Sequence, residues 1–253
     1  MLADRDDLVI AGSFLLTDAV VAAAADRPAG RFIVIDPLVT PAPGPNLEVI
    51  SFREDQAGFL AGALAAMVSR TRVLGGVYGP EGGAMTRYRH GFEMGATTID
   101  ASIRVLGAYQ PAADGRPFGN AEWGQQQALT WLAGGADVIF GAGGSTGEAA
   151  LLPAAADHRH CVGSGADEFL TFPAARACLL TSAMIHADRA VETAVLSAAD
   201  GRFASGTRVF GVADGVVGLA PFHQFDSTVS AAMRARLSAL SEQLSRGEFL
   251  EGN

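Results

Sequence analysis

The residue types that most suggest a binding site lie in a glycine-rich turn. Gly141–Gly147 (GAGGSTG) follows an apolar strand pattern at Asp137–Phe140 and leads into a helical pattern. Backbone N–H groups at such a turn can hold an anion, so a phosphate or dinucleotide site is conceivable. However, no Gly-Lys-Ser/Thr follows, and no acidic residue ends the next strand, where Gly163–Gly165 (GSG) stands. The alternatives are a close approach of the backbone to another ligand and a merely tight turn, and we predict no cofactor.

Catalytic side chains show no recognisable arrangement. Neither Ser145 nor Ser164 stands in the Gly-x-Ser-x-Gly pattern that exposes a hydrolase nucleophile. His90, His186 and His223 are isolated in the sequence, and we expect them on the surface or in loops. The pattern therefore predicts a protein that is not an enzyme and does not turn over a bound ligand.

Carboxylates and aromatic rings follow several predicted strands, and this combination suits a planar polar ligand. Glu54 and Asp55 begin a helix, where adjacent side chains diverge and acids are ordinary partners of the helix dipole. Phe59 lies one turn further along, and the alternative for this residue is packing in the core. Phe118 stands in a polar loop (DGRPFGN), which favours stacking on a ligand over packing in a core.

Two cysteines and two histidines lie near one another without forming a metal motif. Cys161 and Cys178 stand in apolar runs, and we predict two buried thiols that pack as small hydrophobic groups. His158 and His160 flank Cys161, but alternation along an extended strand directs them to the face opposite the thiol. We expect no metal site, and thiols of this kind do not fix the compartment.

Charge and hydropathy exclude two classes of partner. The net charge is −9 and the 18 basic residues are scattered singly, which argues against a nucleic-acid surface. No stretch reaches the roughly 18 apolar residues of a membrane-spanning helix. The start of the chain, MLADRDDLVIAG, lacks the basic region of a signal peptide, so a cytoplasmic location stays open.

Apolar strand patterns alternate with helical patterns along the whole chain. This order predicts parallel sheets covered by helices on both faces, with ligands bound at the carboxyl ends of the strands. The predicted strands are Leu8–Gly12, Arg31–Asp36, Leu47–Phe52, Val73–Tyr78, Ile103–Tyr109, Asp137–Phe140, His160–Gly163, Leu179–Ala183 and Arg208–Gly211. The predicted helices are Leu16–Ala25, Asp55–Ser69, Tyr88–Thr97, Glu122–Leu132, Glu148–Ala156, Ile185–Ala199 and Ser230–Leu244.

Several segments, taken in order, resemble the basic membrane lipoprotein family, the purine-nucleoside-receptor-like substrate-binding proteins of ABC importers. They are SFREDQAGFLAG at 51–62, Val73–Gly79, Gly91-Phe92 with Gly95-Ala96, GADVIF at 135–140 with Gly143-Gly144, Leu180–Ser182, and GVADGVVGLAP at 211–221. The resemblance implies the type I periplasmic-binding-protein fold, an α/β fold with two doubly wound parallel-sheet lobes and a ligand between them. It also implies ABC permease subunits as partners and a membrane-anchored or periplasmic location in the cell envelope.

The resemblance also assigns ligand contacts to residues of this chain. The acidic position falls at Asp55 or Glu54 with Phe59 behind it, the stacking aromatic at Phe118, the glycine turn at Gly143 and Gly144, and an acid for ribose hydroxyls at Asp167. The chain departs from the family pattern at three points. It starts after the usual opening strand, whose loop carries an Asp and an Asn; Gly165 replaces an Asp; and Ile185 replaces a Lys. We therefore expect inosine or guanosine to bind weakly, or another ligand to be preferred.

The expected domains follow from the same comparison. Lobe one would comprise residues 1–70 plus 208–253 and lack its opening strands, and lobe two would comprise residues 72–205. Crossings are expected near Ser69–Arg72, Gly201–Thr207 and Gly218–Phe222. The function that this organisation predicts is an importer's binding protein for a nucleoside-like molecule. The alternatives are a cytoplasmic ligand-sensing or regulatory protein of the same fold and a truncated homologue that does not bind.

Overall fold

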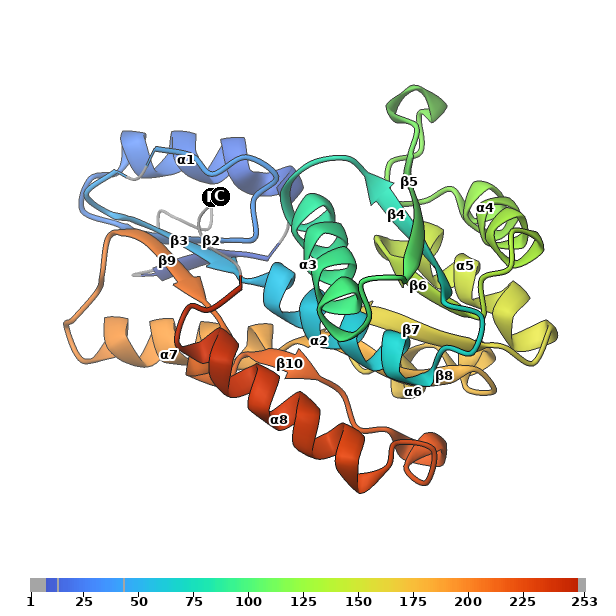
Figure 1. Ribbon diagram of the computed structural model, residues 1–253. Coiled ribbons are helices and arrows are strands. Elements are labelled where there is room, and N and C mark those ends of the chain that lie inside the picture. Colours follow the sequence, from blue (N-terminus) through green and yellow to red (C-terminus); the bar gives the residue numbers. More distant parts are fainter. Residues whose placement is uncertain (1–7, 13, 43, 250–253) are drawn as a thin grey trace. The chain divides into compact units, whose positions relative to one another are not determined.

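The chain divides into two compact units (Figure 1). The computed structural model describes residues 8–12, 14–42 and 44–249. The smaller unit holds the described residues up to Arg53 together with His186–Val216. The larger unit holds Glu54–Ile185 together with the described residues from Val217 onward. The chain thus crosses between the units after Arg53, after Ile185 and after Val216.

The smaller unit is a parallel sheet covered by helices. Its strands have the order β1-β2-β3-β9 and all pair in parallel. Helix α1 covers one face and helix α7 the other (Figure 1). The two central strands, β2 and β3, are near-continuous hydrophobic runs, which is typical of strands buried on both faces. The bounds are Leu8–Ala11 for β1, Thr17–Asp26 for α1, Arg31–Ile35 for β2, Leu47–Phe52 for β3, Ala187–Ala199 for α7 and Gly206–Phe210 for β9.

The larger unit contains a six-stranded sheet of order β10-β8-β7-β6-β4-β5, in which β10 alone runs antiparallel. Its strands are β4 (Val73–Pro80), β5 (Arg104–Gln110), β6 (Val138–Ala142), β7 (His160–Gly165), β8 (Leu179–Ile185) and β10 (Val217–Leu219). Its helices are α2 (Glu54–Val68), α3 (Gly83–Ile99), α4 (Ala121–Ala133), α5 (Gly144–Ala156), α6 (Glu168–Thr171) and α8 (Ala231–Ser245). The predicted α/β class with parallel-sheet lobes is therefore confirmed.

Alternation along β6 shows how helices cover both faces of this sheet. Ile139 packs in a core cluster with Ala128 of α4 and Leu151 of α5. Phe140, the next residue, stacks on Phe92 of α3, with ring centroids 4.8 Å apart. Because successive strand residues point to opposite faces, α4 and α5 cover one face and α3 covers the other.

Helices α2 and α3 touch through glycine. A Cβ atom at Gly58 or Gly62 would overlap backbone atoms of α3, and a Cβ atom at Gly91 or Gly95 would overlap backbone atoms of α2. Along these contacts the residue numbers of both helices increase in the same direction, so the helices run parallel and begin at the same edge of the sheet. Glycine at these positions lets the two backbones come together, as small residues do at close helix contacts.

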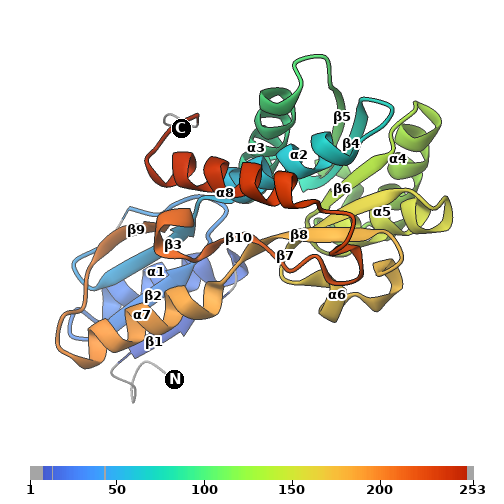
Figure 2. The same cartoon turned by 60° about the horizontal axis from the view of Figure 1, so that its bottom comes forward.

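The boundaries between the units differ from the expected ones. The sequence placed α2 and α8 in lobe one, whereas both belong to the larger unit. The reason is packing: α2 lies against α3, and α8 lies along α2, where Gln56 Nε2 donates to the Leu244 carbonyl at 3.3 Å (Figure 2). The polar Ser69–Arg72 segment is a turn within the larger unit, held by Asp137, whose carboxylate accepts hydrogen bonds from Ser69 Oγ and the Arg70 and Thr71 N–H groups.

The prediction of two free thiols is wrong, because Cys161 and Cys178 form a disulfide. Cys161 is the second residue of β7, and Cys178 immediately precedes β8. Their Cα atoms lie 5.1 Å apart, a normal spacing for a disulfide. The pairing follows from the register of two neighbouring strands, which the sequence spacing of 17 does not reveal. Among the described residues, no group of His, Cys, Asp and Glu could hold a metal.

None of the helices in the described part of the chain combines the length and the apolar character needed to cross a membrane.

Candidate functional site

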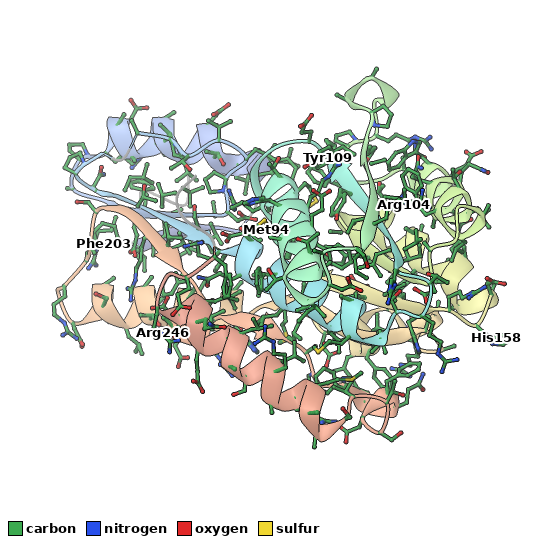
Figure 3. All side chains as sticks on the ribbon, in the orientation of Figure 1. Met94, Arg104, Tyr109, His158, Phe203 and Arg246 are labelled. Carbon is green, nitrogen blue, oxygen red and sulfur yellow. A yellow bond between two sulfur atoms is a disulfide. The ribbon has the colours of Figure 1, made fainter. Side chains whose placement is uncertain are left out.

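The order of strands in the larger unit directs attention to one edge of its sheet. From β4 the chain goes to β5 on one side and then to β6, β7 and β8 on the other, so the direction of winding reverses between β4 and β6. Ligands of open α/β sheets bind at the carboxyl ends of the strands at such a switch point. Tyr109 and Arg104, labelled in Figure 3, lie near the carboxyl and amino ends of β5, and His158 marks the amino edge just before β7.

Three glycines and one aromatic ring meet at this switch point. A Cβ atom on Gly79, at the end of β4, would lie 2.7 Å from Phe118 Cδ1. A Cβ atom on Gly143, after β6, would lie 2.7 Å from the Gly79 Cα, and one on Gly144 would lie 2.8 Å from the Phe118 carbonyl oxygen. Gly143 and Gly144 have φ of 108° and 58°, the left-handed region that glycine adopts without strain. The structure thus brings together Phe118, Gly143 and Gly144, three of the residues singled out in the sequence.

Phe118 is held in place by buried polar groups. Its N–H donates to Gln110 Oε1 at 3.0 Å, and its carbonyl accepts from the Thr146 N–H at 3.3 Å. Thr146 Oγ1 donates to the same Gln110 oxygen at 2.9 Å. Phe118 itself has φ of 63°, unusual for a residue with a bulky side chain. Strained conformations of this kind persist where the surroundings fix them, and they concentrate at functional sites. The ring of Phe118 is half-buried.

Asp167 lies in the turn after β7 and has partners on both carboxylate oxygens. Oδ1 accepts from the Phe169 N–H at 3.2 Å and caps α6. Oδ2 lies 2.8 Å from His223 Nε2. The His223 ring stacks on Phe169, with centroids 4.0 Å apart and an interplanar angle of 10°. His223 lies in the loop before α8, as expected, and the fold brings it next to this turn, a contact that its position in the sequence does not reveal.

Glu168 is a polar residue of this edge that the sequence analysis missed. Only 5% of its surface is exposed, and Oε1 accepts from the Ser164 N–H at 3.0 Å. Its other oxygen, Oε2, is buried without a hydrogen-bond partner among the described residues. Burial raises the pKa of Glu168 to about 7, against the lowering effect of the Ser164 hydrogen bond. No local signal distinguishes this glutamate from an ordinary acid in the first turn of a helix.

The remaining predicted positions lie where α2 packs on α3. Glu54 lies in the first turn of α2, as expected, and it is buried in an ion pair with Arg87, with Oε2 2.5 Å from Nε. Asp55 is 8% exposed and its backbone lies against Gly91. Phe59 is fully buried, and its ring centroid lies 5.2 Å from that of Phe249. Phe59 is therefore a core residue, the alternative that the sequence left open.

A separate groove of about 560 Å³ lies between β10 and α8, bordered by Leu219–His223, Asp226 and Arg234. Its two oppositely charged side chains pair with each other, since Arg234 Nη2 lies 2.8 Å from Asp226 Oδ1. The switch point, where the ring of Phe118 meets glycine turns, is the stronger candidate for a ligand site.

Solved structures similar to this chain define its class. A transcriptional activator of the comK gene from Bacillus halodurans superposes with a TM-score of 0.83 at 19% identity, covering 98% of this chain and 82% of that one. An ABC transporter solute-binding protein from Aeropyrum pernix gives 0.81 at 19% identity, with 98% and 77% covered. A solute-binding protein from Conexibacter woesei gives 0.75 at 20% identity, with 100% and 81% covered. Likeness at this level of identity shows the fold, which is the type I periplasmic-binding-protein fold.

The chain belongs to the family described as ABC transporter substrate-binding protein PnrA-like, whose sequence model matches residues 2–248. It is 30% identical over 158 residues to basic membrane protein A of Borreliella afzelii, covering 59% of this chain and 47% of that protein. It is 28% identical over 138 residues to the ABC transporter nucleoside-binding protein BmpA of Lactococcus lactis, covering 53% and 36%. The chain spans less than half the length of these relatives. The family is one of substrate-binding proteins rather than enzymes, and the resemblance seen in the sequence is confirmed.

Proposed function

We propose that this chain binds a nucleoside-like small molecule and delivers it to the permease subunits of an ABC importer. The observation that carries the proposal is the ring of Phe118, which lies over Gly79 and beside Gly143 and Gly144 at the switch point of the larger sheet and whose backbone is held by Gln110. A half-buried aromatic ring beside a glycine turn, of which Gly144 is exposed, suits a planar ring on one side and polar atoms on the other. The nucleoside-binding relative from Lactococcus lactis supports this class of ligand.

The charges along this edge favour an uncharged ligand over a phosphorylated one. Glu148 and Glu168 are close enough for the charge of Glu148 to raise the pKa of Glu168. Besides the charge of Glu148, Asp167 adds a second carboxylate, in the turn after β7. A phosphate would meet like charge here, and the net charge of −9 also disfavours its approach. We infer that the ligand is a nucleoside, or a similar polar ring compound, without a phosphate group.

The disulfide supports a location in the cell envelope. Disulfides form and persist in oxidising compartments and are rare where cytosolic reductants keep thiols reduced. Cys161 and Cys178 are fully buried, and their bond links the starts of two core strands. This favours an exported binding protein over a cytoplasmic regulator, the alternative that the similarity to a transcriptional activator would suggest.

Two departures from the family pattern bear on affinity. Gly165 has φ of 81° and open space where a side chain would begin, and Ile185 ends β8 opposite Val217. Neither residue can supply the charged hydrogen bond expected of the Asp and Lys that the resemblance places there. Because each such bond contributes about 1.5–3 kcal/mol, we propose that purine nucleosides bind weakly or that a ligand needing fewer charged contacts is preferred.

Calorimetric titration with adenosine, guanosine, inosine, cytidine and uridine tests the proposed function. We expect at least one nucleoside to bind and Phe118→Ala to weaken it about 10- to 100-fold, since stacking of a base on an aromatic ring contributes about 1–3 kcal/mol. Leu129→Ala, which removes an exposed apolar side chain of α4, is the matched control and should leave affinity unchanged. Absence of binding to all five nucleosides would contradict the proposal.

A further inference from the structure

Glu168 has a geometry that the proposed function does not by itself explain. We propose that Glu168 is a positioning residue that, as a neutral acid, holds the turn after β7 in its ligand-binding form. The inference rests on the proposed function, because it assigns this turn, Ser164–Asp167, to the edge that contacts the ligand. It adds Glu168 to the residues that determine ligand affinity, and it makes that affinity depend on the protonation of Glu168.

The backbone and the side chain of Glu168 clamp this turn from two sides. Its N–H donates to Ser182 Oγ in β8 at 3.1 Å. Its carboxyl oxygen Oε1 reaches back to accept from the Ser164 N–H at 3.0 Å. The turn between them, with Gly165 at φ of 81°, is therefore closed by one residue that is anchored to the neighbouring strand. A change at this carboxyl group is transmitted directly to the turn.

Gly163 provides the space for the carboxyl group. A Cβ atom at Gly163 would overlap Glu168 Oε2 and lie 2.9 Å from Ser182 Oγ. The carboxyl group thus fills the place of a missing side chain on β7 and is largely removed from solvent, since the residue is 5% exposed. An oxygen in that position, without a partner among the described residues, is tolerated far better as part of a neutral acid than as part of a carboxylate.

Among the described residues, no charged group forms an ion pair with Glu168. Burial raises the pKa of Glu168 to about 7, against the lowering effect of the Ser164 hydrogen bond, and the charge of Glu148 on α5 raises it by a smaller amount. On the turn itself, Asp167 is paired with His223 from the loop before α8. Arg176, after α6, donates to the Phe169 carbonyl and lies over the Phe169 ring instead of pairing with Glu168.

The expected consequence is a ligand affinity that falls as pH rises. If only the neutral form holds the binding geometry, the apparent affinity is reduced by the neutral fraction, which gives a loss of about 30-fold between pH 5.5 and pH 8.5 for a pKa of about 7. Glu168→Gln places a neutral group of the same shape at the site. Its carbonyl can still accept from Ser164, so the variant should bind with an affinity that changes less than about 2-fold over this range.

The test is calorimetric titration of wild type, Glu168→Gln and Glu148→Gln with the same five nucleosides at pH 5.5, 7.0 and 8.5. Glu148→Gln is the matched control, because it removes a neighbouring carboxylate and leaves the clamp intact, so it should keep a strong pH dependence. Thermal unfolding of each ligand-free variant at each pH establishes that the titrated protein is folded. Gly163→Ala, which takes the space of the carboxyl group, should weaken binding at pH 5.5 as well.

The outcomes separate this inference from the proposed function. A pH-dependent wild type with a pH-independent Glu168→Gln supports the positioning role. Equal pH profiles for wild type and Glu168→Gln would overturn it while leaving the proposed function intact. A wild type that binds nucleosides with the same affinity at all three pH values would overturn it too. A wild type that binds none of the five nucleosides overturns the proposed function and this inference with it.

Discussion

Glycines lie at close contacts in two regions of the larger unit. In one region they face the backbone of a neighbouring helix, and in the other they face an aromatic ring. Between α2 and α3, a Cβ atom on Gly91 would overlap the backbone of Asp55, and one on Gly95 the backbone of Phe59. At the carboxyl edge, a Cβ atom on Gly79 would meet the ring of Phe118, which is half-buried and ends a loop. Backbone in a packed helix pair cannot move aside, whereas a ring on a loop can shift. The first region should therefore control stability, and the second should control binding.

The largest effect is expected from Gly91→Ala. The added methyl group would overlap the backbone of Asp55 and force α2 and α3 apart; overpacking costs about 1–3 kcal/mol and occasionally more, and we expect the upper end of this range or more here. Urea unfolding, followed by circular dichroism, measures the change in free energy of unfolding. Thr97→Ala, on the exposed side of the same helix, is the control and should change stability by less than about 1 kcal/mol. An equally small change for Gly91→Ala would show that the helices are not in contact through glycine.

Removal of the disulfide should come next. Replacing Cys161 and Cys178 together by serine releases a link that spans 17 residues, and we expect a loss of about 3 kcal/mol. The disulfide joins the amino ends of two strands, away from the carboxyl edge, so nucleoside affinity at 25 °C should be unchanged while the protein remains folded. Mass spectrometry with and without reductant verifies the link in the wild type. A chain isolated from an oxidising compartment with two free thiols would remove this support for an envelope location.

Protonation of Glu168 should make stability depend on pH. Its pKa in the folded state, about 7, lies above the ordinary value of 4.5, so folding favours the protonated form. The associated stability is fully present below pH 4.5 and is lost as pH rises through 7. The loss is at most about 3 kcal/mol, at 1.36 kcal/mol per pKa unit. Urea unfolding between pH 4.5 and 8.5 measures it, and Glu168→Gln should remove most of this dependence. A Glu168→Gln variant with the wild-type pH profile would assign the dependence to other groups.

The smallest change in stability is expected at the edge. Gly79→Ala leaves the backbone unstrained, because Gly79 does not have a positive φ, but it displaces the Phe118 ring. We expect stability to change by less than about 1 kcal/mol and nucleoside affinity to fall about 10-fold, which corresponds to about 1.4 kcal/mol. A large loss of stability with unchanged affinity would reverse the comparison between the two regions.

Some features of the fold could be predicted from the sequence, and others could not. Continuous apolar runs identify strands well, and β3 has the predicted bounds, Leu47–Phe52. The helix predicted from Ile185 begins two residues later, since Ile185 pairs with Val217 at the end of β8. Helix α6, with four residues, is too short to show periodicity. Contacts between distant segments are not visible in a local pattern, and the unit boundaries depend on such contacts.

At the candidate site, residue types alone indicate some of the positions, whereas contacts between residues far apart in the sequence cannot be predicted from it. Phe118 and the Gly143-Gly144 turn stand out because their residue types are unusual for their positions. Glu168 does not stand out, since its burial depends on Gly163 and on Ser182 of the next strand. Cys161 and Cys178 were interpreted as thiols because only the register of β7 and β8 brings them together.

Hydrogen–deuterium exchange with and without a bound nucleoside tests most directly whether the ligand contacts the carboxyl edge of β4 and β6. We expect slower exchange, on ligand binding, in peptides that cover Gly79–Gly83, Arg116–Asn120 and Gly143–Thr146. Peptides from the amino edge, such as Asp157–Arg159, serve as the internal control and should exchange at the same rate in both states. A ligand that slows exchange at the amino edge, or that leaves all three carboxyl-edge peptides unchanged, would contradict the assignment of the site.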